Sequence, residues 1–298
     1  MSAKYNIEAD WIINSLCNFS CRYCISHTAK EDPSIGKYSV NHIAQSFDKT
    51  GLTWMLHITG GEPFIFPNFV NLCKLLTQKH FININSNLSQ RSIYKFAEVI
   101  DPSRVSFINV GVHTVEREKR KLVDDLITKN KLLKEKGFYV FFSYVMHPSL
   151  FERYENDFNF YKNNGIILLP KAIRGVIDGK RYPNTYTKDE ITLFKNYAAK
   201  ALSYLKSDRI DGTTPLIDLS LDEEFIEGIP SFHGLACSAG KNFVRIWPDG
   251  TVTQCDRDHN MGNIYEGTMK LRTATTICNT FSCPYFCYKF STFKANLK

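Results

Sequence analysis

The 298-residue sequence lacks any apolar run of the roughly 20 residues that a membrane-spanning helix requires. Its polar start, MSAKYNIEAD, lacks the apolar core of a secretion signal. We therefore expect a cytoplasmic protein without a membrane partner. Long blocks of lysine and arginine are also missing, so the net charge of +7 gives only a mild bias toward anionic partners, and no nucleic-acid partner is expected.

The sequence shows no internal repeat, and its 43% hydrophobic and 22% charged residues are typical of a globular protein. From residue 7 to about 206, apolar strand-like runs alternate with amphipathic helical patterns, which indicates a parallel α/β sheet. Strands are expected at 11–14, 53–59, 81–86, 104–111, 139–145 and 166–169. Helices are expected at 39–50, 66–79, 89–99, 115–136, 150–163 and 187–206. Six units are too few for a closed eight-stranded barrel, and in such folds the chemistry lies at the carboxyl ends of the strands.

Composition predicts how the chain is divided. Residues 1–206 carry the α/β pattern, and residues 207–235, rich in Asp, Gly, Pro and Ser, are predicted to form a connecting segment. Cysteines return after this segment, so a second, small domain is expected at 236–298.

The nine cysteines are odd in number and clustered at short spacings, which favours metal ligation over disulfides. Cys17, Cys21 and Cys24 form a C-x3-C-x2-C loop directly after the first strand. Our interpretation is an iron–sulfur loop in which three thiolates bind three irons of a [4Fe–4S] cluster and the fourth iron has no protein ligand. A zinc site with a fourth ligand nearby, or coincidental core cysteines, are the alternatives. Cys73 shares an apolar helix stripe and is expected to be buried.

This loop, with Tyr23 before its last cysteine, resembles the cluster loop of the radical S-adenosylmethionine (radical SAM) superfamily. In that family the open iron chelates the amino and carboxylate groups of SAM. The resemblance implies an open, partial (β/α)6 TIM-like barrel, followed here by a small α+β cysteine-rich domain.

A second motif, Gly60-Gly61-Glu62-Pro63, directly follows the second strand. Paired glycines allow a close backbone approach to a ligand, and the glutamate adds a hydrogen-bond acceptor. A plain strand-to-helix turn with proline near its start is the alternative. The motif resembles the family's GGE motif, whose backbone and glutamate hold the amino group of SAM, and Pro63 is included among the cofactor-binding candidates.

Further candidates lie at the ends of the later strands. Ser86 and Asn87 occupy the place where related enzymes contact SAM, although a turn closed by Asn87 is nearly as plausible. Val145 is a candidate for packing on adenine, with ordinary core packing as the alternative. His113 and Tyr144 are candidate catalytic residues, although a lone histidine is more often a satisfied polar residue.

Cations gather after the sixth strand, between residues 171 and 181. We expect Lys171 and Arg174 to bind a phosphate or carboxylate of the substrate. A solvated basic loop is the alternative.

The C-terminal region holds five more cysteines, which suit one auxiliary [4Fe–4S] cluster or a structural zinc: Cys237, Cys255, Cys278, Cys283 and Cys287. A Pro-Asp-Gly turn predicts a hairpin over 243–255. The C-x12-G-x4-C spacing and the later Gly-Asn-Ile resemble the SPASM/Twitch extension of radical SAM enzymes. Because the seven-cysteine pattern is incomplete, the shorter Twitch type fits better. We favour all but Cys278 as ligands, with Cys278 as the substitute for one of them.

The resemblance implies that a reduced cluster donates one electron to SAM, and that the resulting 5′-deoxyadenosyl radical removes hydrogen from a substrate. Flavodoxin or ferredoxin would be the electron donor. We expect an oxidoreductase or epimerase acting on a small, polar, anionic metabolite such as a sugar, an aminocyclitol or a nucleotide-linked sugar. The short stretch before the first strand, which leaves no room for a peptide-recognition domain, favours this substrate class. A peptide or protein maturase is the alternative, and a zinc-binding interaction module would leave the GGEP motif unexplained.

Overall fold

The computed structural model describes residues 5–24, 31–205, 222–223, 225–228, 231–255 and 259–281. Six strands alternate with helices along the chain: β1 (Ile7–Ile12), β2 (Trp54–Thr59), β3 (Phe81–Ser86), β4 (Val105–Gly111), β5 (Val140–Val145) and β6 (Leu168–Lys171). The helices are α1 (Val40–Lys49), α2 (Phe69–Leu76), α3 (Ser92–Val99), α4 (Thr114–Lys119), α5 (Val123–Glu135), α6 (Tyr154–Asn163) and α7 (Lys188–Leu202). None of these described helices is both long and apolar enough to cross a membrane.

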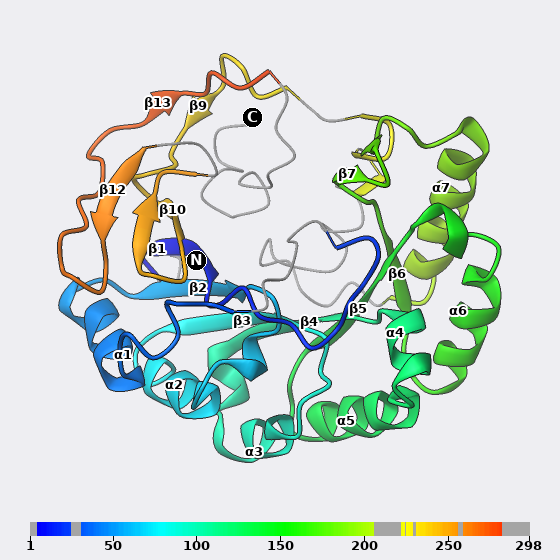
Figure 1. Cartoon of the computed structure of the whole chain (residues 1–298), viewed down its shortest axis with the longest axis horizontal. Helices are drawn as coiled ribbons and strands as arrows, with labels where there is room; N and C mark the ends of the chain where they lie inside the picture. Colours follow the sequence, from blue (N-terminus) through cyan, green and yellow to red (C-terminus); the bar gives the residue numbers. More distant parts are fainter. Residues whose placement is uncertain are drawn as a thin grey trace.

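Together with β10 (Phe243–Ile246), β11 (Thr251–Thr253) and β12 (Asn260–Asn263), the strands form one open, curved sheet in the order β12-β11-β10-β1-β2-β3-β4-β5-β6, in which β1 to β6 are mutually parallel. Figure 1 shows the helices on the outer side of the arc and the inner face turned toward the centre. The predicted partial (β/α)6 barrel is confirmed. All six parallel strands therefore end at one rim, where the loops that follow them meet.

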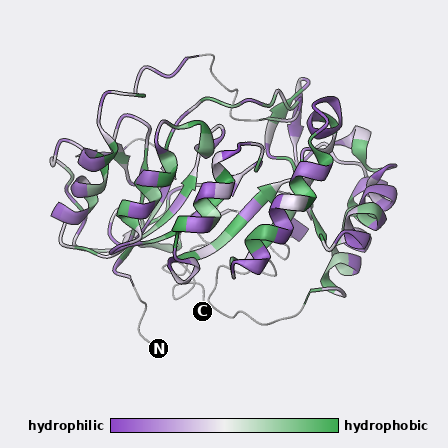
Figure 2. Ribbon diagram, turned by 90° about the horizontal axis from the view of Figure 1, so that it is seen from below, coloured by the Kyte–Doolittle hydropathy of each residue, from purple (hydrophilic) through white to green (hydrophobic). Residues whose placement is uncertain are grey.

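Aromatic packing joins the outer face of the sheet to the helices. The rings of Trp11 and Trp54 lie 5.1 and 5.5 Å from the ring of Phe47 on α1, and all three side chains are fully buried. Ser39 caps the first turn of this helix by accepting a hydrogen bond from the backbone N–H of His42. In Figure 2 the helix ribbons alternate between hydrophilic and hydrophobic residues, as expected of helices with one face on a sheet.

Two elements differ from the sequence expectation. β1 begins at Ile7, four residues before the predicted strand, because Glu8 and Asp10 alternate with apolar residues and face the inside of the arc. The single helix expected over 115–136 is two helices, α4 and α5, with Lys121 between them at φ 56°. This break gives α4 a direction of its own, and α4 contacts the cysteine loop.

The C-terminal strands continue the sheet of the barrel. β10 (Phe243–Ile246) pairs in parallel with β1 and antiparallel with β11 (Thr251–Thr253), so the predicted hairpin is confirmed. β12 (Asn260–Asn263) follows β11 at the edge, and β9 (Ala236–Cys237) pairs with β13 (Thr276–Ile277). A further small hairpin, β7 (Gly175–Ile177) and β8 (Lys180–Tyr182), follows β6. The division into domains stays a prediction, and most of the connecting segment 207–235 lies outside the described residues.

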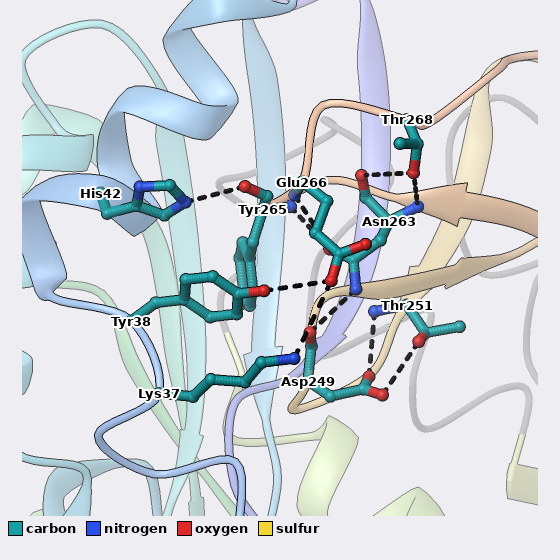
Figure 3. A network of polar contacts seen from close by, with 9 residues as sticks. All are labelled: Lys37, Tyr38, His42, Asp249, Thr251, Asn263, Tyr265, Glu266 and Thr268. Carbon is teal, nitrogen blue, oxygen red and sulfur yellow. Dashed lines mark hydrogen bonds and ion pairs between the residues drawn. The ribbon is translucent and has the colours of Figure 1, made fainter.

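Polar contacts join this C-terminal layer to the segment that carries α1 (Figure 3). His42 Nε2 lies 2.8 Å from the carbonyl oxygen of Tyr265, and Tyr38 donates to Glu266 Oε1 over 3.2 Å. Trp11 Nε1 on β1 donates to the hydroxyl of Tyr265 over 3.1 Å. The segment after β12 is therefore fixed to the barrel by side chains, and the hairpin that precedes Cys255 by the pairing of β10 with β1.

Candidate functional site

The cysteine loop, residues 17–24, follows β1 and is anchored to the loop after β3. Asn18 Nδ2 donates to Ser89 Oγ over 2.7 Å, and Asn87 Nδ2 donates to Asn18 Oδ1 over 3.1 Å. Asn87 Nδ2 also lies 3.9 Å from the sulfur of Cys17. The sequence-predicted Asn87 is therefore part of the support of the cluster loop.

The short helix α4 also contacts the cysteine loop. The backbone N–H of Ser20 donates to Glu116 Oε2 over 3.1 Å. The ring of Phe19 lies under two guanidinium groups, those of Arg117 at 5.7 Å and Arg120 at 5.4 Å. Sequence reasoning missed these contacts, because α4 was expected to be part of one longer helix.

Tyr23 packs on His113, the residue that precedes α4. The two rings are stacked with centroids 5.9 Å apart, and the Tyr23 hydroxyl lies 3.2 Å from His113 Nδ1. His113 adopts the left-handed conformation at φ 47°, and a Cβ at Gly111 would lie 2.2 Å from its Nε2. Burial lowers the pKa of His113 to about 4, so its imidazole is neutral at physiological pH. The structure thus brings His113 to the cysteine loop, and its catalytic role stays a prediction.

The three thiols of the loop lie close enough to act on one another electrostatically. Burial, together with the nearby Cys24 and Cys17 thiols, raises the pKa of Cys21 to about 12. Burial likewise raises the pKa of Cys17. Within the described ranges, no three Cys, His, Asp or Glu side chains close around a single metal ion. A [4Fe–4S] cluster suits this spacing, because each thiolate binds a different iron.

The GGEP motif lies against the cysteine loop through its backbone. The N–H of Gly61 donates to the carbonyl oxygen of Asn14 over 2.9 Å, and that of Glu62 donates to the carbonyl oxygen of Leu16 over 2.7 Å. A Cβ added to Gly61 would lie 1.9 Å from the Leu16 oxygen, and one added to Gly60 would lie 2.4 Å from the Asn14 oxygen. Only glycine permits this approach, so the motif and the loop that precedes Cys17 form one unit.

The carboxylate of Glu62 is fully buried and is held by three protein donors. Its Oε1 accepts from Ser86 Oγ at 2.7 Å and from the N–H of Phe64 at 3.1 Å, and its Oε2 accepts from the N–H of Asn87 at 2.7 Å. Burial raises the pKa of Glu62, while these hydrogen bonds oppose that shift. Ser86 and Glu62 therefore join the end of β2 to the end of β3. Pro63 begins the 3₁₀ turn Pro63–Ile65.

The two candidates on β5 face opposite sides of the sheet. Tyr144 points toward α6, where its hydroxyl donates to Asp157 Oδ2 over 2.6 Å and its ring packs edge-on against Tyr154. Strand alternation therefore places Tyr144 in the outer layer rather than with the cysteine loop. Val145 is half-buried on the inner face at the end of the strand, and its contact with adenine stays a prediction.

Lys171 and Arg174 both bind a carboxylate of this chain. Arg174 forms a hydrogen-bonded ion pair with Asp222, and the Lys171 ammonium lies 3.6 Å from the same carboxylate. The guanidinium of Arg174 also lies 4.4 Å from the ring of Phe225. A substrate anion would have to compete with Asp222, which lies 48 residues away from Arg174 along the chain, and no local sequence signal indicates this partner.

Three C-terminal cysteines lie together. Burial raises the pKa of Cys237, and the thiols of Cys278 and Cys255 raise it further, which places all three within electrostatic range. The β9–β13 pairing brings Cys237 and Cys278 together, because Cys237 lies on β9 and Cys278 follows β13. The N–H of Cys278 also donates to the Leu235 carbonyl oxygen over 2.9 Å. Cys283 and Cys287 lie outside the described residues. The identity of the auxiliary ligands stays a prediction.

A family model described as the radical SAM superfamily matches residues 11–160, about half of the chain, which includes the cysteine loop, the GGEP motif and α4. The chain belongs to the radical SAM superfamily. Membership implies SAM and a [4Fe–4S] cluster as cofactors, and three thiols within electrostatic range of one another are compatible with the cluster. Cys17, Cys21 and Cys24 would hold it.

One curated protein is similar to this radical SAM protein in sequence, and two solved structures are similar to it in fold. A GTP 3′,8-cyclase of Pseudomonas fluorescens (strain Pf0-1) is 29% identical over 126 residues, which are 39% of this chain and 37% of that enzyme. SuiB of Streptococcus suis, solved with S-adenosylmethionine, superposes with a TM-score of 0.58 at 15% identity, over 88% of this chain and 64% of SuiB. The structure of anSMEcpe with AdoMet and the Cp18Cys peptide gives 0.58 at 14% identity, over 87% and 78%. At these identities the two structures indicate a shared fold.

Proposed function

We propose that this radical SAM enzyme removes hydrogen from a small polar substrate, with dehydrogenation or epimerisation as the net reaction. When bound and reduced, the cluster supplies the electron that splits SAM into methionine and a 5′-deoxyadenosyl radical. The chain's own residues hold the cysteine loop on three sides, place neutral His113 against Tyr23, and present a polar surface to the substrate. The observation that carries the substrate class is the row of polar side chains on the inner face of the sheet.

The deeper part of this row crosses β1, β2 and β3. His57 Nε2 lies 3.1 Å from Glu8 Oε2, and Asn83 Nδ2 lies 2.5 Å from His57 Nδ1. In the tautomer that carries its proton on Nε2, His57 donates to the Glu8 carboxylate and accepts at Nδ1 from the Asn83 amide. All three side chains are buried and bonded to one another. They form the buried end of the polar row.

The part nearer the rim crosses β3, β4 and β5. Asn109 Nδ2 donates to Asn85 Oδ1 over 2.8 Å, and Ser143 Oγ donates to Asn109 Oδ1 over 2.7 Å. Asn85 and Asn109 are half-buried, and the Asn85 amide N–H groups donate to no residue of the described chain. Closed barrels fill this position with branched apolar side chains. Hydrogen-bonding groups here instead suit a substrate rich in hydroxyl or amino groups.

The relative that acts on GTP supports a nucleotide-type substrate for this chain. An anionic group on that substrate would reach Lys171 and Arg174 only by displacing Asp222, so the polar row is the stronger argument. We also propose an auxiliary cluster on the C-terminal cysteines, which would accept an electron from the product radical in an oxidation. Flavodoxin or ferredoxin is the proposed electron donor.

A peptide-modifying reaction is the second candidate. It is favoured by the fold shared with SuiB, which has been solved with its precursor peptide SuiA, and with anSMEcpe, which has been solved with a peptide. A peptide would use the rim of the sheet more than the polar row. The two candidates therefore differ in their dependence on Asn109.

Replacing Asn109 with leucine tests the polar row. We expect the slow release of 5′-deoxyadenosine without substrate to persist, because the side-chain hydrogen bonds of Asn109 go to Asn85 and Ser143. Stimulation of that release by sugar nucleotides or aminocyclitols should fall at least about tenfold, since Asn85 and Ser143 both lose their hydrogen-bond partner. The measurement is 5′-deoxyadenosine formation with each candidate substrate.

Asn164→Leu is the matched control, because Asn164 directly follows α6 and its Nδ2 donates to the Phe160 carbonyl oxygen at the surface. It should leave both rates unchanged. Stimulation by a peptide alone, equal in wild type and Asn109→Leu, would overturn the small-substrate proposal.

A further inference from the structure

Arg117 on α4 is fully buried beneath the cysteine loop. Its Nε donates to the carbonyl oxygen of Val112 over 2.6 Å, and its Nη2 donates to the carbonyl oxygens of Asn87 and, at 3.3 Å, Gly111. It therefore ties the end of β3 to the end of β4. Its Nη1 has no hydrogen-bond partner in the described part of the chain.

The guanidinium carries an uncompensated charge in this position. Buried arginines are normally paired with a carboxylate, yet among the described residues none lies within ion-pair distance of Arg117. Burial lowers the pKa of Arg117 to about 10, which still leaves it protonated at neutral pH. The acidic groups that act on it from further away are the Tyr161 hydroxyl, Glu62, Asp125 and the thiol of Cys21.

The neighbouring cations do not share this situation. Arg120 also lies over Phe19, but it is partly exposed and pairs with Glu116 at 3.1 Å. Lys129 is buried and pairs with Asp125 at 2.6 Å. Arg117 thus combines full burial, closeness to the cysteine loop and the lack of a carboxylate partner.

We propose that Arg117 is the built-in counter-charge of the cysteine loop and makes a bound cluster easier to reduce. The inference rests on the proposed function, because it assumes a cluster on Cys17, Cys21 and Cys24. Reduction adds one negative charge to a site that already carries three thiolates. A fixed positive charge in a low-dielectric surrounding stabilises the reduced state more than the oxidised state. Arg117 is therefore a positioning residue that also acts through its charge.

The test is the midpoint potential of the reconstituted cluster, measured by an EPR-monitored redox titration without SAM. Arg117→Gln should shift the potential to more negative values. Arg117→Lys, which keeps the charge, should stay near wild type, and so should Arg120→Gln, because water screens the charge at that exposed position. Iron content is measured on each variant beforehand.

If Arg117→Gln does not retain iron, the comparison is made between lysine and Nε-acetyl-lysine at position 117, which differ in charge on the same stem. An unchanged potential in an iron-loaded variant without the charge would overturn the proposal, as would an equal shift in Arg117→Lys. Wild-type protein that binds no iron would instead overturn the proposed function itself, so the two failures are distinguishable.

Discussion

Gly61→Ala should nearly abolish SAM cleavage. The new Cβ would lie 1.9 Å from the carbonyl oxygen of Leu16 and 3.0 Å from the nitrogen of Cys17, and both are backbone atoms that cannot rotate away. The cysteine loop must move, which breaks the hydrogen bond from the N–H of Glu62 to that Leu16 oxygen. A misplacement of about 1 Å at reacting groups costs about a hundredfold in rate, and overpacking costs about 1–3 kcal/mol of unfolding free energy. The measurements are 5′-deoxyadenosine release and thermal unfolding.

Gly165→Ala is the matched control. Gly165 has a φ of +75° with no atom within 4 Å of the added Cβ, and it precedes β6 at the opposite end of the strands. It should lose only the roughly 1 kcal/mol of left-handed backbone strain and keep its SAM cleavage. Normal cleavage by Gly61→Ala would show that the close approach of the two loops is dispensable.

Glu62→Gln, which replaces one carboxylate oxygen by an amide nitrogen, should lower both the stability of the protein and its affinity for SAM. The three donors that surround the carboxylate leave no place for an amide N–H₂, which would face the N–H of Asn87 or the pair formed by Ser86 and Phe64. A buried donor left without an acceptor costs about 1–3 kcal/mol. The change also removes an anionic group that acts on Arg117. We expect a lower melting temperature together with a loss of SAM binding, measured by thermal unfolding and equilibrium dialysis with labelled SAM.

Glu98→Gln provides the comparison, since the exposed Glu98 pairs with Lys95 alone among the residues that the structure describes and should change neither property measurably. A Glu62→Gln variant with wild-type stability and SAM affinity would contradict the role of Glu62 as the link between β2 and β3.

The fold was largely predictable from sequence because the outer face of each strand follows a clear apolar pattern. β2 to β6 begin within two residues of their predicted starts, and their helices follow in order. β1 was placed too late because Glu8 and Asp10 interrupt its apolar pattern. These two residues belong to the polar inner face of the sheet. The apolar pattern of the outer face therefore predicted where the strands lie, but it gave no information about the polar residues on the inner face.

The cysteine loop and the GGEP motif were also predictable, because local spacing carries their chemistry. The contacts that hold these motifs in place were not predictable, since the residues that make them are distant in sequence. Glu116 and Arg117 reach the loop from α4, Glu116 from 96 residues along the chain, and Asp222 lies 48 residues from Arg174. Strand alternation separates Tyr144 from Val145, but no local signal indicates that its partner is Asp157 on α6. Such contacts depend on packing between elements, which spacing along one segment does not report.

The measurement that tests the central claim most directly is anaerobic iron and sulfide analysis with a SAM-cleavage assay. It compares wild type with a variant in which Cys17, Cys21 and Cys24 are alanine. With both the SAM-binding and the proposed auxiliary cluster, wild type should hold about eight irons and the variant about four, and only wild type should release 5′-deoxyadenosine. About four irons in wild type and none in the variant would remove the auxiliary cluster from the account. Zinc without iron, or cleavage of SAM by the variant, would contradict a radical SAM reaction on this loop.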